Sequence, residues 1–282
     1  MARSVQRRAK PLLGTLVEIG LCVDESINDA RLQSIFTDGF NAITHIHSLM
    51  SWHEPASDLS RFNRAAVNQW VQCDLHTITV FGFAKKLHEL SQGCFDICSD
   101  HASGYTSAIE VDALNHRLRK RSALSADLGG IAKGYAVDVG TQAIAQTIIQ
   151  HDVGRDEGGR DRAGQQSAGV YGGWINAGGD CSVFGDLSLP LMVRTPWALD
   201  QPIEVEQLQD RSAATSANHD SVNTVVKDGS TKLPAGGTCC AAVSAYDCMT
   251  ADALTKIVMA TNNDCELLMQ FFGATSWYFT DA

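Results

Sequence analysis

The sequence lacks long apolar runs and an excess of positive charge. Nowhere do about 18 apolar residues follow one another, so membrane insertion is not expected. The chain has 22 Lys and Arg against 32 Asp and Glu, which gives a formal net charge of −10. Such a chain has no general attraction for phosphate backbones or anionic lipid, so neither nucleic acid nor a membrane surface is expected as a partner.

Paired cysteines of the kind that bind zinc are also missing. The nine cysteines show no C-x-x-C pair and no zinc-type spacing, which predicts reduced and mostly buried thiols. The stretch 1–10 is a basic tail before a short apolar segment, which Gly14 and Glu18 interrupt and no small-residue cleavage site follows. Without a signal peptide or a lipidated cysteine, we expect a cytoplasmic protein.

The sequence does contain enough apolar material for one substantial core, with 44 % hydrophobic and 19 % charged residues. Apolar residues recur at steps of three and four, typical of helices, or alternate, typical of half-buried strands. Helices and strands interleave irregularly, so a single α+β domain, 1–282, is favoured over a doubly wound sheet. The glycine-rich, charged stretch 151–169 predicts a flexible surface insertion. The predicted helices are 30–50, 77–92, 130–149 and 249–261, and the strands are 15–23, 170–176, 191–195, 203–206, 240–245 and 275–280.

The segment Asp127–Asp138 (DLGGIAKGYAVD) places two glycines before a predicted helix and Lys133 in its first turn. A helix start with free N–H groups, a glycine that permits close approach and one lysine suits a diphosphate. It is neither common phosphate loop, because G-x-G-x-x-G is absent and Lys133-Gly134 is not followed by Ser or Thr. An ordinary strand-to-helix turn with a solvated lysine is the alternative.

The segment Ile175–Asp180 (INAGGD) joins the end of a predicted strand to two glycines and an acid. Gly178 and Gly179 would let the backbone approach a ligand closely, with Asp180 beside it. The same residues also suit a hairpin turn in which Asp180 is a turn residue. Turn chemistry alone favours neither role.

A carboxylate and a hydroxyl three residues apart mark the predicted helix at 249–261. Asp252 shares one side of this helix with either Thr255 or Lys256. The oxygens of Asp252 and Thr255 are at a spacing that suits Mg²⁺, which completes its shell with phosphate and water. The alternative is helix capping, with Thr250 as the N-cap and Asp252 favourable to the helix dipole.

The segment Met50–Asn63 (MSWHEPASDLSRFN) follows a predicted helix and combines rings with hydrogen-bonding groups. Trp52 or His53 could stack on a flat ring of a ligand. The alternative is a capped loop in which Ser57 or Asp58 begins a short helical turn.

These four segments, with Leu13–Ile19 before them and Phe95–Ile97 between them, resemble the ApbE family of FAD:protein FMN transferases over nearly the whole chain. The string Asp127–Asp138 is close to the family's usual sequence. The resemblance implies a domain related to the T-fold, with mixed or antiparallel sheets flanked by helices. It also implies Mg²⁺-dependent transfer of the FMN part of FAD to a Thr or Ser hydroxyl of an acceptor flavoprotein, with release of AMP.

The resemblance implies roles for individual residues as well. FAD would contact the first strand, the loop after the first helix and the glycine-rich turn, and Mg²⁺ would lie at the diphosphate. Asp252 and Lys133 carry over as catalytic residues. The metal set is Gly130, through its backbone carbonyl, with Asp252 and Thr255. The cofactor-binding set is Leu13, Ser51, Trp52, His53, Asp96, Asp127, Lys133, Gly178, Gly179 and Asp180.

The sequence departs from the family pattern in several places. Leu13 stands where Met is usual, Trp52-His53 where Thr-Tyr is usual, and Lys256 at the usual metal threonine. The family's His-Ile-Ile-Asp-Pro segment, expected to hold the general base, has no clear match around 225–228. Two alternatives therefore stand beside the transferase: an FAD pyrophosphatase that yields FMN and AMP, and a non-catalytic FAD-binding protein.

Overall fold

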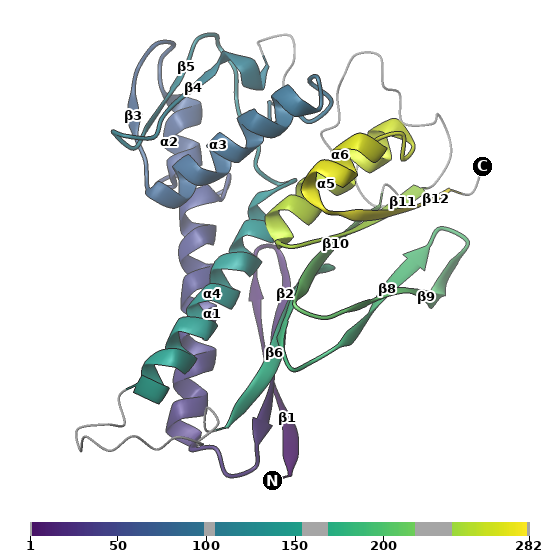
Figure 1. Cartoon of the computed structure of the whole chain (residues 1–282). Helices are drawn as coiled ribbons and strands as arrows, with labels where there is room; N and C mark the ends of the chain where they lie inside the picture. The colour runs from purple at the N-terminus through teal and green to yellow at the C-terminus, as the bar shows by residue number, and fades with distance from the viewer. Residues whose placement is uncertain (1, 99–104, 154–168, 218–238, 281–282) are drawn as a thin grey trace.

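A computed structural model of the chain describes residues 2–98, 105–153, 169–217 and 239–280. As predicted, the fold is α+β: a broad antiparallel sheet carries helices α1, α4 and α5 over one face and the β8–β9 hairpin over the other (Figure 1). Six of the nine cysteines are buried. Within the described residues, no helix has both the length and the apolar character to span a membrane.

The main sheet is antiparallel throughout, and its strands follow one another in chain order, although other elements are inserted between some neighbours. The order is β1-β2-β6-β7-β10-β11-β12, so β2 pairs with β6 although α1 to α4 lie between them in the sequence. Val17, Ile19 and Leu21 alternate along β2 and are fully buried under the helices, which is the predicted period. The strands are β1 Arg3–Leu12, β2 Thr15–Asp24, β6 Val170–Ala177, β7 Asp180–Gly185, β10 Arg211–Ala217, β11 Cys239–Ala245 and β12 Thr275–Thr280.

Two long helices, α1 (Asp29–Met50) and α4 (Ala132–Val153), lie side by side against the sheet (Figure 1). α1 begins at Asn28, whose side chain accepts two backbone N–H groups of the first turn. The helices approach closely because Gly140 of α4 has no side chain: a Cβ there would lie 2.8 Å from Ile43 Cγ1. This contact fixes the ends of both helices relative to each other.

A smaller layer covers one end of the α1–α4 pair, and the remaining elements flank the far strands of the main sheet (Figure 1). In the small layer, Asp58 accepts the backbone N–H of Asp74 at 2.6 Å, which ties the start of α3 to α2. The small sheet has the order β3-β5-β4. The bounds are α2 Asp58–Arg64, β3 Val71–Gln72, α3 Leu75–Leu90, a 3₁₀ turn Thr106–Ala108, β4 Ile109–Asp112, β5 Arg117–Lys120, β8 Leu189–Thr195, β9 Ala198–Leu208, α5 Cys248–Thr261 and α6 Glu266–Phe272.

The predicted helices and strands are confirmed to within a few residues, with three corrections. α4 continues to Val153, so the insertion predicted at 151–169 begins inside a helix, and its residues 154–168 lie outside the described part of the chain. The basic tail is strand β1, which pairs with β2 along its whole length. Finally, α5 is capped by Asp247, whose side chain accepts the N–H of Thr250, and not by Thr250 itself.

Candidate active site

A cavity of about 260 Å³ opens where the β1–β2 turn, the end of α1 and the start of α4 meet. Six residues that the sequence predicts for the cofactor line it: Leu13, Ser51, Trp52, His53, Asp127 and Lys133. The rest of the lining is Gly14, Ile46, His47, Met50, Leu59, Leu128, Gly129 and Ala132. The fold thus brings three separate sequence segments to one place.

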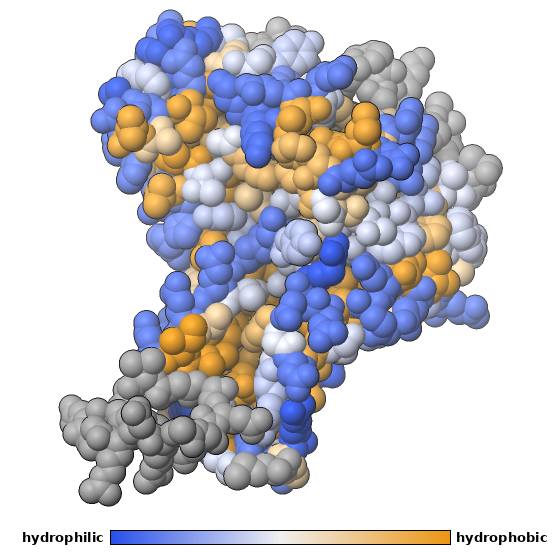
Figure 2. Space-filling view, in the orientation of Figure 1, coloured by the Kyte–Doolittle hydropathy of each residue, from blue (hydrophilic) through white to orange (hydrophobic). Residues whose placement is uncertain are grey.

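A larger cavity, of about 560 Å³, lies between α3, α5 and α6. Its lining includes Leu90, Leu267 and Phe271, and Figure 2 shows apolar residues gathered over these helices. It has neither lysine nor arginine in its lining and none of the predicted cofactor residues, so nothing in it would hold a diphosphate. We therefore place the active site at the smaller cavity.

The turn between β1 and β2 presents Leu13 to the cavity. Leu12 and Thr15 pair across it, which leaves a loop of two residues, and both have positive φ, 55° at Leu13 and 71° at Gly14. Two positive φ values are typical of the tightest hairpin turns, but they are unusual for a leucine. The paired strands on both sides hold the leucine in this conformation.

The loop after α1 is fixed by two serine side chains. Ser57 Oγ donates to the carbonyl of Ser51 at 2.7 Å, and Ser60 Oγ donates to the carbonyl of Trp52 at 3.1 Å. Ser57 is also the N-cap of α2, which confirms the capping alternative for this segment. Because the backbone is held and 48 % of Trp52 is exposed, its ring is also available for stacking.

The start of α4 supplies positive potential. Asp127 Oδ1 accepts the N–H of Gly129 at 2.8 Å, and helical bonding begins when the N–H of Ala132 donates to the carbonyl of Leu128. Gly129, Ala132 and Lys133 all line the cavity, so the positive end of the helix dipole lies beside it. A phosphate group is favoured at such a helix start.

Lys133 reaches from α4 towards two buried carboxylates. Its Nζ forms an ion pair with Asp180, and neither Asp180 nor Asp252 is exposed to solvent. Burial disfavours the charged lysine, but attraction by Asp252 and Asp180 outweighs it and raises the pKa of Lys133. Burial and then repulsion by Asp252 raise the pKa of Asp180 to about 6. Asp180 is therefore a buried anchor for the lysine.

A second lysine, Lys256, lies among the residues predicted to bind the metal. Its Nζ is 3.1 Å from Asp252 Oδ1 and 3.1 Å from Thr255 Oγ1, and it also donates to Ser216 Oγ. A Cβ added to Gly130 would lie 3.2 Å from Lys256 Cε, so the lysine stem passes close to that backbone. Burial would raise the pKa of Asp252, but attraction by Lys256 helps to lower it. Two of the predicted metal ligands, Asp252 and Thr255, thus contact an ammonium group.

Asp138, the last residue of the glycine-rich string, positions the helix that carries Asp252. Its two carboxylate oxygens accept the backbone N–H groups of Cys248, at 2.7 Å, and Met249, at 2.8 Å, at the start of α5. Burial nevertheless raises the pKa of Asp138 to about 7. No signal in the sequence indicated this role, because the partners of Asp138 lie 110 and 111 positions away.

Gly134 allows α4 and α5 to touch beside the site: a Cβ there would lie 2.3 Å from the carbonyl oxygen of Cys248. We expect Gly134→Ala to lower the free energy of unfolding by about 2 kcal/mol or more, because the helices would have to separate. Urea unfolding measures the loss. Gly82→Ala in α3 is the matched control, since no atom lies within 4 Å of its added Cβ, and it should be neutral or stabilise by up to about 1 kcal/mol. Equal losses in both variants would contradict this packing.

Four residues predicted to bind the cofactor are not in the cavity lining, and one of them, Asp180, is instead the ion-pair partner of Lys133. Asp96 is buried elsewhere, where it accepts the hydroxyl of Thr106 at 2.7 Å. Gly178 and Gly179 form the β6–β7 turn, with φ of 67° and 103°, which confirms the hairpin alternative. Their cofactor roles stay predictions, and residues 225–228 lie outside the described part of the chain. No signal in the sequence could have identified His47, which lines the cavity, or Ser216, which accepts a hydrogen bond from Lys256.

Comparison with known proteins points to one family. Residues 13–153, half of the chain, match the model of the ApbE family. None of the curated proteins matches the sequence. Flavinyl transferase ApbE of Pseudomonas stutzeri, in its apo form, is 15 % identical with a TM-score of 0.72 over 99 % of this chain and 93 % of that one. An ApbE protein of Thermotoga maritima is 21 % identical, with a TM-score of 0.73 over 99 % of this chain and 95 % of that one. Flavin transferase ApbE of Vibrio cholerae is 17 % identical, with a TM-score of 0.71 over 98 % of this chain and 93 % of that one. At these identities the structures establish the fold.

Proposed function

Since this chain belongs to the ApbE family, we propose that it transfers the FMN part of FAD to a Thr or Ser hydroxyl of an acceptor protein and releases AMP. The observation that carries the proposal is one cavity that joins the Trp52 ring, the start of α4 and Lys133. An exposed indole suits the flat flavin ring, and a positive helix start with a lysine suits the diphosphate. The shared fold with solved proteins named flavin transferases supports the same activity.

Magnesium dependence follows from the family resemblance, and the oxygens of Asp252, Thr255 and Ser216 are of the kind that Mg²⁺ binds. In this structure, however, the ammonium of Lys256 takes the position between these oxygens. The arrangement does not fit a metal ion at the same point, because cation and ammonium would compete for one carboxylate. We therefore propose that Lys256 and Lys133 supply the positive charge beside the diphosphate. Dependence on magnesium is the alternative, and the labelling rate with and without Mg²⁺ distinguishes the two.

The proposed reaction forms one P–O bond and breaks another. The acceptor hydroxyl oxygen attacks the phosphorus on the FMN side of the diphosphate and loses its proton, while the bridging oxygen leaves with AMP. Negative charge grows on that bridging oxygen, so fixed positive groups beside it lower the barrier. Lys133 and the start of α4 supply such charge, and buried Asp180 holds the Lys133 ammonium in place.

The test is incubation of the purified protein with FAD and a flavodomain acceptor that carries a target threonine. We expect a covalently fluorescent acceptor and an equal amount of AMP, and neither with an acceptor whose threonine is replaced by alanine. Release of FMN and AMP without labelling would instead establish a pyrophosphatase. Bound FAD without AMP would leave a flavin-binding protein.

A further inference from the structure

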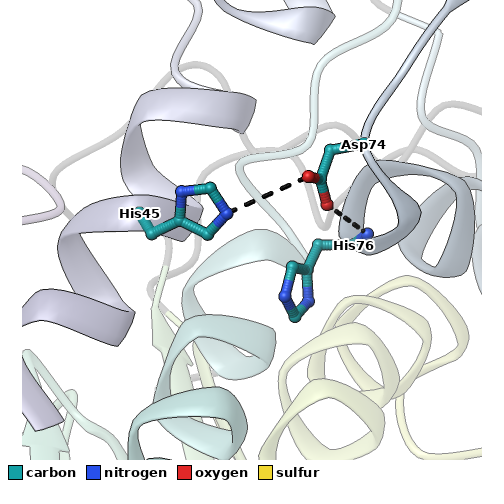
Figure 3. Close-up of side chains that lie close together, drawn as sticks. All are labelled: His45, Asp74 and His76. Atoms are coloured by element: carbon teal, nitrogen blue, oxygen red, sulfur yellow. Dashed lines mark hydrogen bonds and ion pairs between the residues drawn. The ribbon is translucent and has the colours of Figure 1, made fainter. Parts of the chain in front are cut away.

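Two histidines and an aspartate form a cluster outside the flavin cavity, where α1 approaches the start of α3 (Figure 3). His45 belongs to α1, Asp74 is the N-cap of α3, and His76 lies in the first turn of α3. One ring nitrogen or carboxylate oxygen from each lies within 4.8 Å of the other two. Among the described residues, this is the one group of His, Cys, Asp or Glu side chains found at that spacing.

The fold brings the three side chains close together. Asp74 Oδ1 accepts the backbone N–H of His76 at 2.8 Å, while Asp74 Oδ2 lies 4.0 Å from His45 Nε2 (Figure 3). On the other side, His76 Nδ1 lies 2.8 Å from the hydroxyl of Tyr135 on α4. Histidines that bind metals usually have the second ring nitrogen held by another group. Tyr135 does this for His76 and leaves its Nε2 available.

The contacts within the cluster leave room for a cation. The distance of 4.0 Å between His45 and Asp74 is too long for a hydrogen bond, and their side chains are 52 % and 37 % exposed, so an ion and a water molecule can enter. Each imidazole would offer the metal the lone pair of one ring nitrogen.

We propose that His45, Asp74 and His76 bind one Zn²⁺ ion. Two imidazoles and one carboxylate are ligands that Zn²⁺ takes at about 2.0–2.2 Å, with water as the fourth ligand. The three side chains need only a small inward movement from their present spacing. The site is separate from the flavin cavity, because His47, two positions further along α1 and on another side of the helix, lines that cavity. Zinc would therefore clamp the start of α3 to α1 whether or not flavin transfer takes place.

The experiment is a calorimetric titration of the whole chain with ZnCl₂, after treatment with a chelator, together with thermal unfolding. We expect the protein to take up one equivalent and its Tm to rise by about 5 °C when free zinc is about a hundred times the Kd. His45→Ala and His76→Ala should each weaken binding by about tenfold or more, and the double variant should abolish it. Asp74→Ser removes the carboxylate but keeps an oxygen to cap α3, and it should weaken binding as well.

Two controls separate this site from other zinc ligands. His116→Asn removes an exposed imidazole from a turn outside the cluster and places there a residue that tolerates its φ of 49°, so zinc uptake should not change. The competing ligands are the cysteines, which would give thiolate charge-transfer bands in a Co²⁺-loaded sample. Three results would each overturn the proposal. They are such bands, one equivalent of zinc still bound by the double histidine variant, or no zinc bound by the unaltered protein.

Discussion

Lys133→Met is expected to slow flavin transfer by about 10²- to 10³-fold, because a fixed positive charge beside the leaving oxygen is lost. The same change leaves Asp180, which is fully buried, without the ammonium that pairs with it. A buried carboxylate that loses its partner costs about 3 kcal/mol or more of stability. The measurements are the rate of covalent labelling at saturating FAD and urea unfolding of the same samples.

A double variant separates the chemical role of Lys133 from its role in the fold. Lys133→Met with Asp180→Asn removes both charges, so stability should recover in part while labelling stays slow. Lys86→Met, which changes an exposed lysine on α3, should leave both unchanged. If labelling recovered together with stability, Lys133 would act through the fold alone and the charge assigned to it would be wrong.

Lys256→Thr is expected to make the enzyme dependent on magnesium. The unaltered protein should label its acceptor at the same rate in Mg²⁺ and in EDTA, because the Lys256 ammonium already neutralises Asp252. Threonine at this position offers an oxygen one helical turn from Asp252, where Mg²⁺ could join both. We expect labelling by this variant to fall by about 10²-fold in EDTA and to return with Mg²⁺. The measurement is the labelling rate of both proteins under both conditions.

The outcome that contradicts this assignment differs from the outcome that contradicts flavin transfer. Loss of labelling by the unaltered protein in EDTA, with recovery in Mg²⁺, would show that a metal displaces Lys256, while the transferase function would stand. Lys86→Thr is the matched control, and its labelling rate should change with neither EDTA nor Mg²⁺. Labelling under no condition would instead contradict the proposed function itself.

Local signals in the sequence predicted a large part of the fold and of the cavity. Alternation along β2 and three-to-four spacing along α1 depend on neighbours within a few residues, so they are visible without the fold. The family resemblance placed Leu13, Trp52 and Lys133 together, and the structure brings them to one cavity. The short strands β4 and β5 were missed, because four residues carry too little periodicity.

The contacts that fix the charges could not be predicted, because they join distant parts of the chain. The partners of Asp138 on α5 and the pairing of Lys256 with Ser216 on β10 depend on how the helices lie on the sheet. The sequence predicted Thr255 and Asp252 as metal ligands, and the structure shows that the Lys256 ammonium contacts both. The hydrogen bond that the Thr106 hydroxyl donates to buried Asp96 likewise had no signal in the sequence.

The pairing of β2 with β6 also determines how the protein can fold as it is synthesised. The side chains of Glu18 and Trp174 form a hydrogen bond across 156 positions, so β2 leaves the ribosome on the order of 10 s before its partner strand. During that time its apolar face can be covered only by helices that precede β6 in the chain, of which α1 is synthesised first. The other side of the nascent hairpin is strand β1, where Arg7, Arg8 and Lys10 are exposed. Their charges discourage other chains from pairing with β1, which remains an edge strand of the finished sheet.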